Sequence, residues 1–373
     1  MLNWIIGDGE VLSPNGLAQN DLFLSDGHIT DVPSSDARRF SAKDCVVLPG
    51  IVDVHGDAFE RVVSPRPNVS FDLELSLHEV DRQLITNGIT TAFHGLTASF
   101  EPGLRSFDAA GAFLNALDRI SGDLLSDMHV NLRWEVFSLD REDELIEWLR
   151  ARPSILLSLN DHLTAYRNLT ADALKITRMA DRSGLSPQAC VDLIQTLSNR
   201  GDEVPDVVKR VTQSAKALGR TVFAHDETSP DMRAMHRQLG VTVSEFPMTK
   251  DTARNAIDAN EAVVLGAPNV LRGGSQNNAV DAEPAIAEGL CTVLASDYYY
   301  PAPLLAAFAL NARHGMDLAQ AWALVSSAPA QAAGRDDRGT LATGKRADVV
   351  VVDPRSKRVR ATFVAGRKVF ECE

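Results

Sequence analysis

The chain has 373 residues, which is enough for a large single domain or for a barrel with a small appendage. Of these residues, 45% are hydrophobic and 23% are charged, which is ordinary for a globular enzyme. The formal net charge of −13 argues against nucleic acid or an anionic membrane surface as the main partner. It also means that an anionic substrate must be held by a few local cations.

The sequence carries no sign of export or of a membrane span. Residues Met1–Pro14 lack a basic start followed by an apolar core, so we expect no signal peptide. The sequence contains no run of about 18 apolar residues, so we expect no membrane-spanning helix. The four cysteines lie far apart without a C-x-x-C pair, which favours reduced thiols. We therefore expect a cytoplasmic protein.

Both chain ends predict short strands with tight turns. Residues 1 to about 45 contain several such strands, and Asp26-Gly27 is a hairpin-turn signal. The tail from about residue 339 has the same character, with apolar runs in 349–353 and 361–370. Neither end has enough apolar surface for its own core. We therefore expect residues 1–47 and 339–373 to form one composite β-sandwich beside a domain of residues 48–338.

In the central domain, apolar strands alternate with helical stretches, the pattern of a parallel α/β fold. Eight such units predict a (β/α)8 TIM-like barrel, with its active site at the carboxyl ends of the strands. The predicted strand ends are His55, Ala92-Phe93-His94, Glu135, Asp161-His162, His225-Asp226-Glu227, Glu245-Phe246-Pro247, Gly266-Ala267-Pro268-Asn269 and Ser296-Asp297.

Residues 163–203 interrupt this alternation. They contain helical patches at 171–181 and 187–198 that are separated by Gly184, with Tyr166 and Arg167 near the start. A helical insertion that pads the barrel and a substrate lid are both compatible with this pattern.

Metal-type side chains follow five of the predicted strands. His55 and Asp57 are two residues apart in an extended segment, so their side chains point to the same side. Imidazoles and carboxylates at one rim need partners when buried, and divalent metal ions supply them. The predicted ligand set is His55, Asp57, Glu135, His162, His225 and Asp297. His94 is a spare candidate that we expect to be structural.

Several motifs make the chain similar to the amidohydrolase superfamily, and within it to the phosphonate-catabolism branch. They include segments 48–57, 132–135, 158–162, 225–227, 245–249, 265–275, 296–299 and 344–348. The resemblance implies a barrel with a small β-sandwich from both ends and two divalent ions, zinc first, with manganese or iron as alternatives. The superfamily usually places its two histidines on strands five and six, whereas His162 and His225 fall on predicted strands four and five. Either the strand count is off by one, or one of these histidines is not a ligand.

The resemblance also implies the activity, which is hydrolysis of α-D-ribose 1-methylphosphonate 5-triphosphate, or a close analogue, to the 5-phosphate and pyrophosphate. Glu135 would bridge two ions that lower the pKa of a shared water, and Asp297 would be both ligand and base. Cations must converge on the phosphoryl oxygens. We expect Arg66 and Arg272 to do so, helped by Gly273, Gly274 and Ser275, whose turn can present N–H groups to a phosphate.

Two other classes of function stay open. The same metal set would hydrolyse a cyclic amide or deaminate a base, and some barrels without metals act as assembly or binding proteins. The expected ligand is a small phosphorylated sugar phosphonate rather than nucleic acid or membrane. A homodimer and contacts with other enzymes of phosphonate metabolism are further expectations.

Overall fold

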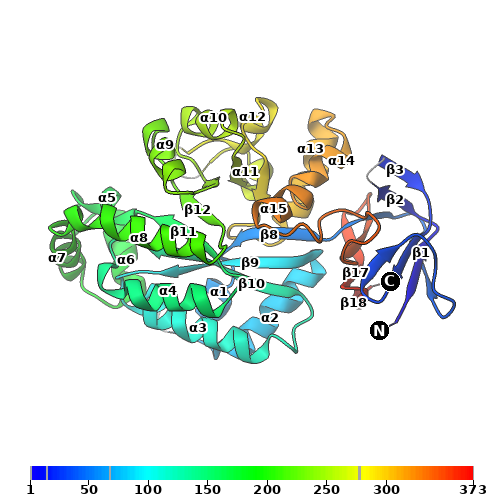
Figure 1. The fold of residues 1–373 in the computed structure, drawn as a ribbon, viewed down its shortest axis with the longest axis horizontal. Coiled ribbons are helices and arrows are strands. Elements are labelled where there is room, and N and C mark those ends of the chain that lie inside the picture. Colours follow the sequence, from blue (N-terminus) through cyan, green and yellow to red (C-terminus); the bar gives the residue numbers. More distant parts are fainter. Residues whose placement is uncertain (1, 14–15, 67–68, 276–278, 373) are drawn as a thin grey trace.

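The computed structural model describes residues 2–13, 16–66, 69–275 and 279–372. One eight-stranded parallel sheet forms a nearly closed barrel, in the strand order β15-β14-β13-β12-β11-β10-β9-β8 (Figure 1). The predicted TIM-like barrel is therefore confirmed. Its strands are β8 (Ile51–Gly56), β9 (Ile89–Ala98), β10 (Asp127–Glu135), β11 (Leu156–Asn160), β12 (Val222–His225), β13 (Val243–Glu245), β14 (Ala262–Gly266) and β15 (Val293–Ala295).

The barrel closes between its first and last strands. The Asp57 N–H donates to the Asp297 carbonyl at 2.9 Å, and the Asp297 N–H donates to the His55 carbonyl at 2.8 Å. Below this pair, the buried carboxylate of Asp53 accepts hydrogen bonds from the Ser296 N–H and hydroxyl. Residues of the predicted metal set thus form part of the seam that joins β8 to β15.

Two antiparallel-rich sheets from both chain ends lie beside the barrel (Figure 1). Trp4, Ile6 and Phe363 belong to the apolar core between these sheets. The predicted composite of both ends is confirmed. One sheet has the order β5-β4-β1-β6 and the other β18-β17-β16-β7-β2-β3, from strands β1 (Trp4–Gly7), β2 (Glu10–Ser13), β3 (Gly16–Gln19), β4 (Leu22–Ser25), β5 (His28–Thr30), β6 (Arg38–Ser41), β7 (Val46–Pro49), β16 (Val349–Asp353), β17 (Arg358–Val364) and β18 (Arg367–Glu371).

Helices cover the outside of the barrel, and their apolar faces make the largest core cluster. A second cluster, with Val54, Phe93 and Phe223, fills the barrel interior. The helices between and after the strands are α1 (Glu60–Val63), α2 (Leu73–Thr86), α3 (Phe107–Ile120), α4 (Glu142–Ala151), α8 (Val204–Ala217), α9 (Pro230–Gln238), α10 (Lys250–Asp258), α11 (Ala267–Arg272), α12 (Ala282–Ala287), α13 (Ala302–His314), α14 (Leu318–Ala323) and α15 (Ser327–Ala332). Among the described residues, no helix combines the length and apolarity needed to cross a membrane.

Two residues explain where α2 begins and how the chain turns after it. The Asp72 carboxylate caps the helix by accepting the Leu75 N–H. After the helix, Gly88 has φ +76°, and a Cβ there would lie 2.9 Å from a methyl carbon of Val350. Only glycine can therefore take this left-handed turn so close to the terminal sheet before β9 begins.

The insertion at 163–203 is helical, as predicted, with α5 (His162–Tyr166), α6 (Leu174–Ser183) and α7 (Pro187–Ser198). Gly184 ends α6 in the left-handed conformation, at φ 74°. The insertion reaches the barrel through an ion pair from Arg182 to Glu101. Tyr166 stacks on His162 with ring centroids 6.4 Å apart. These contacts put the insertion next to the strand ends where the predicted site lies.

Candidate active site

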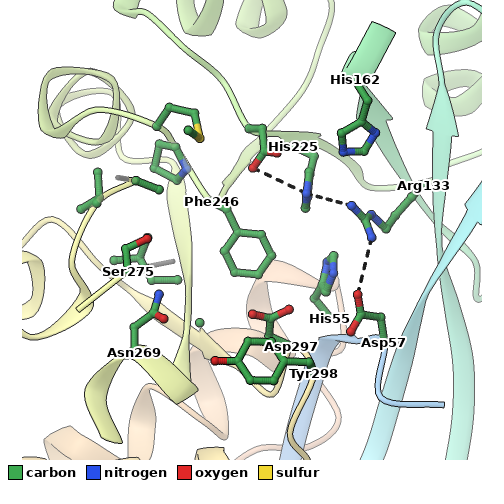
Figure 2. Close-up of a pocket in the computed structure, with 17 residues that line it drawn as sticks. His55, Asp57, Arg133, His162, His225, Phe246, Asn269, Ser275, Asp297 and Tyr298 are labelled. Atoms are coloured by element: carbon green, nitrogen blue, oxygen red, sulfur yellow. Dashed lines mark hydrogen bonds and ion pairs between the residues drawn. The ribbon is translucent and has the colours of Figure 1, made fainter. Parts of the chain in front are cut away.

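A cavity of about 250 Å³ lies at the carboxyl ends of the barrel strands. Figure 2 shows the side chains that point into it. Five of the six predicted metal ligands line this cavity: His55, Asp57, His162, His225 and Asp297. The remaining lining residues are Arg133, Asp226, Phe246, Pro247, Met248, Leu265, Gly266, Asn269, Ser275, Ala279, Val280 and Tyr298.

Glu245, at the end of β13, joins two of the histidines. Its Oε1 lies 2.8 Å from Nδ1 of His55, and its Oε2 lies 2.9 Å from Nδ1 of His225. Asn131 donates a further hydrogen bond to Oε1, and Ser158 donates one to Oε2. Burial opposes ionisation of this carboxyl, but the two imidazoles hold its pKa well below the usual range. The carboxylate only accepts, so each imidazole must present its Nδ1–H to it.

His225 consequently offers its other nitrogen to the cavity. Burial is the main reason that its pKa is lowered, so the ring is neutral and Nε2 carries a lone pair. That nitrogen accepts a hydrogen bond of 2.9 Å from Nη2 of Arg133. A neutral imidazole that is oriented by a carboxylate is the usual form of a metal-binding histidine.

Glu135, at the end of β10, is engaged with His162. Its Oε2 lies 2.9 Å from Nδ1 of His162, and its Oε1 accepts the His162 N–H at 2.9 Å. Glu135 is buried, and its two hydrogen bonds hold His162 in one orientation. Among the described residues, Glu135 is not part of any group of side chains placed to hold a metal ion. Its predicted role as a bridging metal ligand stays a prediction.

Three groups of donor atoms in the cavity could hold a metal ion, each with its atoms within 4.8 Å of one another. The carboxylates of Asp57 and Asp297 meet in one of these groups. Burial is the main cause that raises the pKa of Asp297 to about 6, and the negative charge of Asp57 is the next. A divalent cation would relieve that repulsion, and the donors are those that zinc, manganese and iron accept. The cavity therefore fits the expected metals. The groups are His55 with Asp57 and Asp297, His55 with His225 and Glu245, and His162 with His225 and Asp226.

The structure resolves the question of strand number. His162 follows β11, the fourth barrel strand, and His225 ends β12, the fifth. The count from sequence was therefore right. His162 and His225 nevertheless meet in one donor group, so both stay predicted ligands, at strand positions that differ from those usual in the superfamily. The sixth strand ends in Glu245, which sequence reasoning placed at a strand end but did not include in the site. Its position at the same rim as the predicted ligands was the signal that could have identified it.

Three residues at these strand ends have an unusual backbone conformation. Asp226, Phe246 and Asp297 have φ values of 56°, 51° and 53°, in the left-handed region that non-glycine residues rarely adopt. Phe246 meets the rings of His55 and His225 edge-on, at centroid distances of 5.0 and 5.3 Å. The strained conformation thus places an aromatic wall against both histidines.

The predicted phosphate-binding residues occupy different positions. Arg272 donates to the Tyr298 hydroxyl at 3.0 Å, and Tyr298 and Ser275 line the cavity. The N–H groups of Gly273 and Gly274 donate to the Asn269 carbonyl, and that of Ser275 donates to Asp281. These N–H groups are therefore occupied within the chain. Arg66 is exposed and does not line the described part of the cavity.

His94 lies apart from the donor groups. It is fully buried, and its ring meets Phe59 and Phe113 edge-on at centroid distances of 5.4 and 6.0 Å. Burial lowers its pKa to about 4, so the ring is neutral. This packing agrees with the structural role expected for His94.

Comparison with known proteins gives a consistent assignment. The model of the amidohydrolase family matches residues 46–369. A curated protein of Escherichia coli (strain K12), alpha-D-ribose 1-methylphosphonate 5-triphosphate diphosphatase, is 27% identical over 389 residues, which cover 98% of this chain and all of the relative. Among solved structures, molinate hydrolase has a TM-score of 0.66 and 14% identity, covering 99% of this chain and 94% of its own. Dihydropyrimidinase from Brevibacillus agri NCHU1002 has a TM-score of 0.66 and 15% identity, with 99% and 95% covered.

Proposed function

The chain belongs to the amidohydrolase family, and from this premise we propose that it is a metal-dependent diphosphatase of phosphonate metabolism. Its substrate would be α-D-ribose 1-methylphosphonate 5-triphosphate or a close analogue, and its products the 5-phosphate and pyrophosphate. The observation that carries the proposal is the similarity to the E. coli diphosphatase over 98% of this chain. The segments 132–135, 265–275 and 296–299 supply cavity residues, which supports a shared site.

The cavity residues divide into ligands and residues that orient them. His55, Asp57, His162, His225 and Asp297 would hold the metal, while Glu245 fixes His55 and His225 and Glu135 fixes His162. When bound, two divalent ions would lower the pKa of a water towards neutrality and make it a nucleophile. Zinc is the first candidate for these ions, with manganese or iron as alternatives. Elemental analysis should find about two ions per chain, and fewer in His55→Ala and His225→Ala.

Asp297 is the proposed base. Its carboxylate is partly buried and lies in one donor group with His55 and Asp57, so it can take a proton from the attacking water. The water oxygen would bond to phosphorus as the P–O–P linkage between the first and second phosphoryl groups breaks. Pyrophosphate leaves with the bridging electron pair, and the sugar keeps one phosphate.

The proposal includes the surroundings of the enzyme. We place it in the cytoplasm, as a homodimer that works beside other enzymes of phosphonate metabolism. Sedimentation of the purified chain would test the dimer.

A substrate panel tests the activity directly. Pyrophosphate release from ribosyl triphosphates with and without a C1 methylphosphonate should be measured with added zinc or manganese, alongside hydrolysis of cyclic amides and deamination of aminopurines. We expect turnover of the triphosphates, and a loss of a few orders of magnitude in kcat for Asp297→Asn with the fold intact. Turnover of amides or aminopurines and none of the triphosphates would replace the proposal with an amidohydrolase activity.

A further inference from the structure

Arg133 is the one arginine or lysine that lines the described part of the cavity. It lies inside β10, two residues before Glu135, so the two side chains leave the strand on the same side. Figure 2 shows its guanidinium between His225 and Asp57. The residue is 5% exposed, so its charge is largely removed from water.

This guanidinium has few partners for a buried cation. Nη2 donates to His225, a neutral acceptor, and Nη1 lies 3.9 Å from Oδ2 of Asp57, beyond hydrogen-bond distance. Its Nε–H has no hydrogen-bond acceptor among the described residues. A buried charge in this state is unfavourable unless something else pairs with it.

Two other buried arginines show how the same fold serves a structural cation. Arg233 is paired with Glu227 and Glu261, and it also donates to the Val241 carbonyl at 2.7 Å. Arg338 is paired with Asp127 and Asp337. Both guanidiniums have two carboxylates, whereas none of the described carboxylates lies at hydrogen-bond distance from Arg133. Arg133 therefore differs from the arginines whose role is to hold the fold.

We propose that Arg133 is the specificity residue of this site, which takes a phosphoryl oxyanion of the substrate, and that His225 is its partner only while metal and substrate are absent. The inference rests on the proposed function and deepens it. A metal ion and the guanidinium need the same lone pair on Nε2 of His225. Metal binding at His225 therefore leaves Nη2 of Arg133 free to donate to an incoming anion.

The chemistry of the cavity favours an oxyanion at this position. Asp57, Asp226 and Asp297 also line it, so an anionic substrate has to find its positive charge locally. A guanidinium presents a planar fork of N–H donors that matches two oxygens of a phosphoryl group. A carboxylate would match the same fork, so the test must separate the two.

The test is a calorimetric titration of the zinc-saturated full chain with inorganic phosphate, repeated with acetate. Arg133→Gln should weaken phosphate binding at least about tenfold, the loss of one charge-assisted pair, and Arg133→Lys should weaken it less. Arg82→Gln, at a 64% exposed position on α2, is the matched control and should bind phosphate within about twofold of wild type. Zinc affinity, measured by competition with a chelator, should be equal or tighter in Arg133→Gln.

Each result decides the inference. Unchanged phosphate affinity in Arg133→Gln would overturn it, and so would a parallel loss of zinc in both Arg133 variants, which would make Arg133 a structural residue. Equal Arg133-dependent binding of acetate would overturn the phosphoryl assignment. These binding data are independent of turnover. A substrate panel without triphosphate hydrolysis would refute the proposed function, while the Arg133 titrations would refute only this inference.

Discussion

At the centre of the cavity, one carboxylate serves two imidazoles from different strands. Glu245 is fully buried, and each of its oxygens contacts one histidine Nδ1. The residue therefore orients the rings of His55 and His225 and keeps a proton on Nδ1 of each. Loss of this carboxylate should therefore disturb two histidine ligands at once.

Replacement of Glu245 should disable the site without a large change in the fold. In Glu245→Gln, the amide can accept from one Nδ1–H but presents its NH2 to the other histidine, which must turn or change tautomer. We expect metal affinity and kcat/KM to fall by roughly 10–100-fold. Metal content and turnover should be compared with those of Glu288→Gln, an exposed glutamate whose side chain is 41% accessible. Equal metal content in both variants would show that Glu245 does not orient the ligands.

The close fit of two barrel strands also shapes the site. Gly95 lies in the buried strand β9, and a Cβ at this position would be 2.9 Å from Nε2 of His55. His55 cannot easily move away, because Glu245 holds the opposite nitrogen of its ring. The missing side chain on β9 therefore provides the space for a site residue on β8.

A single added methyl group tests this fit. Gly95→Ala should displace the His55 ring and lower kcat/KM by roughly 10–100-fold, since small misplacements in a preorganised site are costly. The control is Gly122→Ala, where a Cβ would meet no atom within 4 Å. Circular dichroism should show both variants folded. Wild-type kcat/KM in Gly95→Ala would mean that the ring has room to shift.

At the opposite end of the barrel, the first residue of β10 is tied to the segment that leads into the terminal sheets. Asp127 accepts from Arg338 at 2.5 Å, and Arg346 lies 3.4 Å away. His129 lies 3.1 Å from its other oxygen. Burial opposes ionisation, but His129 and the two guanidiniums hold the pKa of Asp127 below its usual value of 3.8.

This carboxylate should stabilise the fold in a pH-dependent manner. A depressed pKa contributes stability above the unfolded value, and the contribution is lost as the pH falls below about 3.8 towards the folded value. Asp127→Asn should lower the free energy of unfolding by roughly 2–4 kcal/mol at neutral pH and by less in acid. Urea unfolding at several pH values measures the difference. Asp118→Asn, whose carboxylate is 53% exposed, should cost less than about 1 kcal/mol, and a constant effect of Asp127→Asn at every pH would contradict the assignment.

At the scale of the whole molecule, the barrel and the terminal sheets are connected too closely to unfold apart. Only Gly50 separates β7 from β8. The Trp322 indole N–H donates to the Pro49 carbonyl at 2.9 Å, and the Thr362 hydroxyl donates to the Ile85 carbonyl at 2.7 Å. Both hydrogen bonds are buried and join the two parts of the fold.

We therefore expect one cooperative thermal transition for the metal-saturated chain. Scanning calorimetry should show a single transition, and Asp127→Asn should move the whole transition to lower temperature. Two resolved transitions, of which only one responds to this substitution, would show that the sheets and the barrel are independent.

The barrel could be predicted from the sequence, but the site only in part. Alternation of apolar strands and helices predicts eight strand ends, and the structure brings five of the predicted ligands to one cavity. The sequence places Glu245 at the rim of the site, but its pairing with His55 could not be predicted, because that contact spans 190 residues and exists only in the folded barrel. The spacing of Arg133 to Glu135 predicts that both side chains leave the strand on the same side. The burial of the guanidinium and its lack of partners could not be predicted, because they exist only in the folded barrel.

The pairing of β7 with β16 has a consequence for synthesis on the ribosome. The sheet β5-β4-β1-β6 uses only residues 4–41 and can pair early, but Trp4 packs on Phe363, at a centroid distance of 5.6 Å. Val46 pairs with Val352, about 300 residues later, a delay of roughly 15–60 s at about 5–20 residues per second. During this time, β7 presents an apolar edge without its final neighbour. The nascent chain is therefore a natural client for chaperones that bind exposed strands.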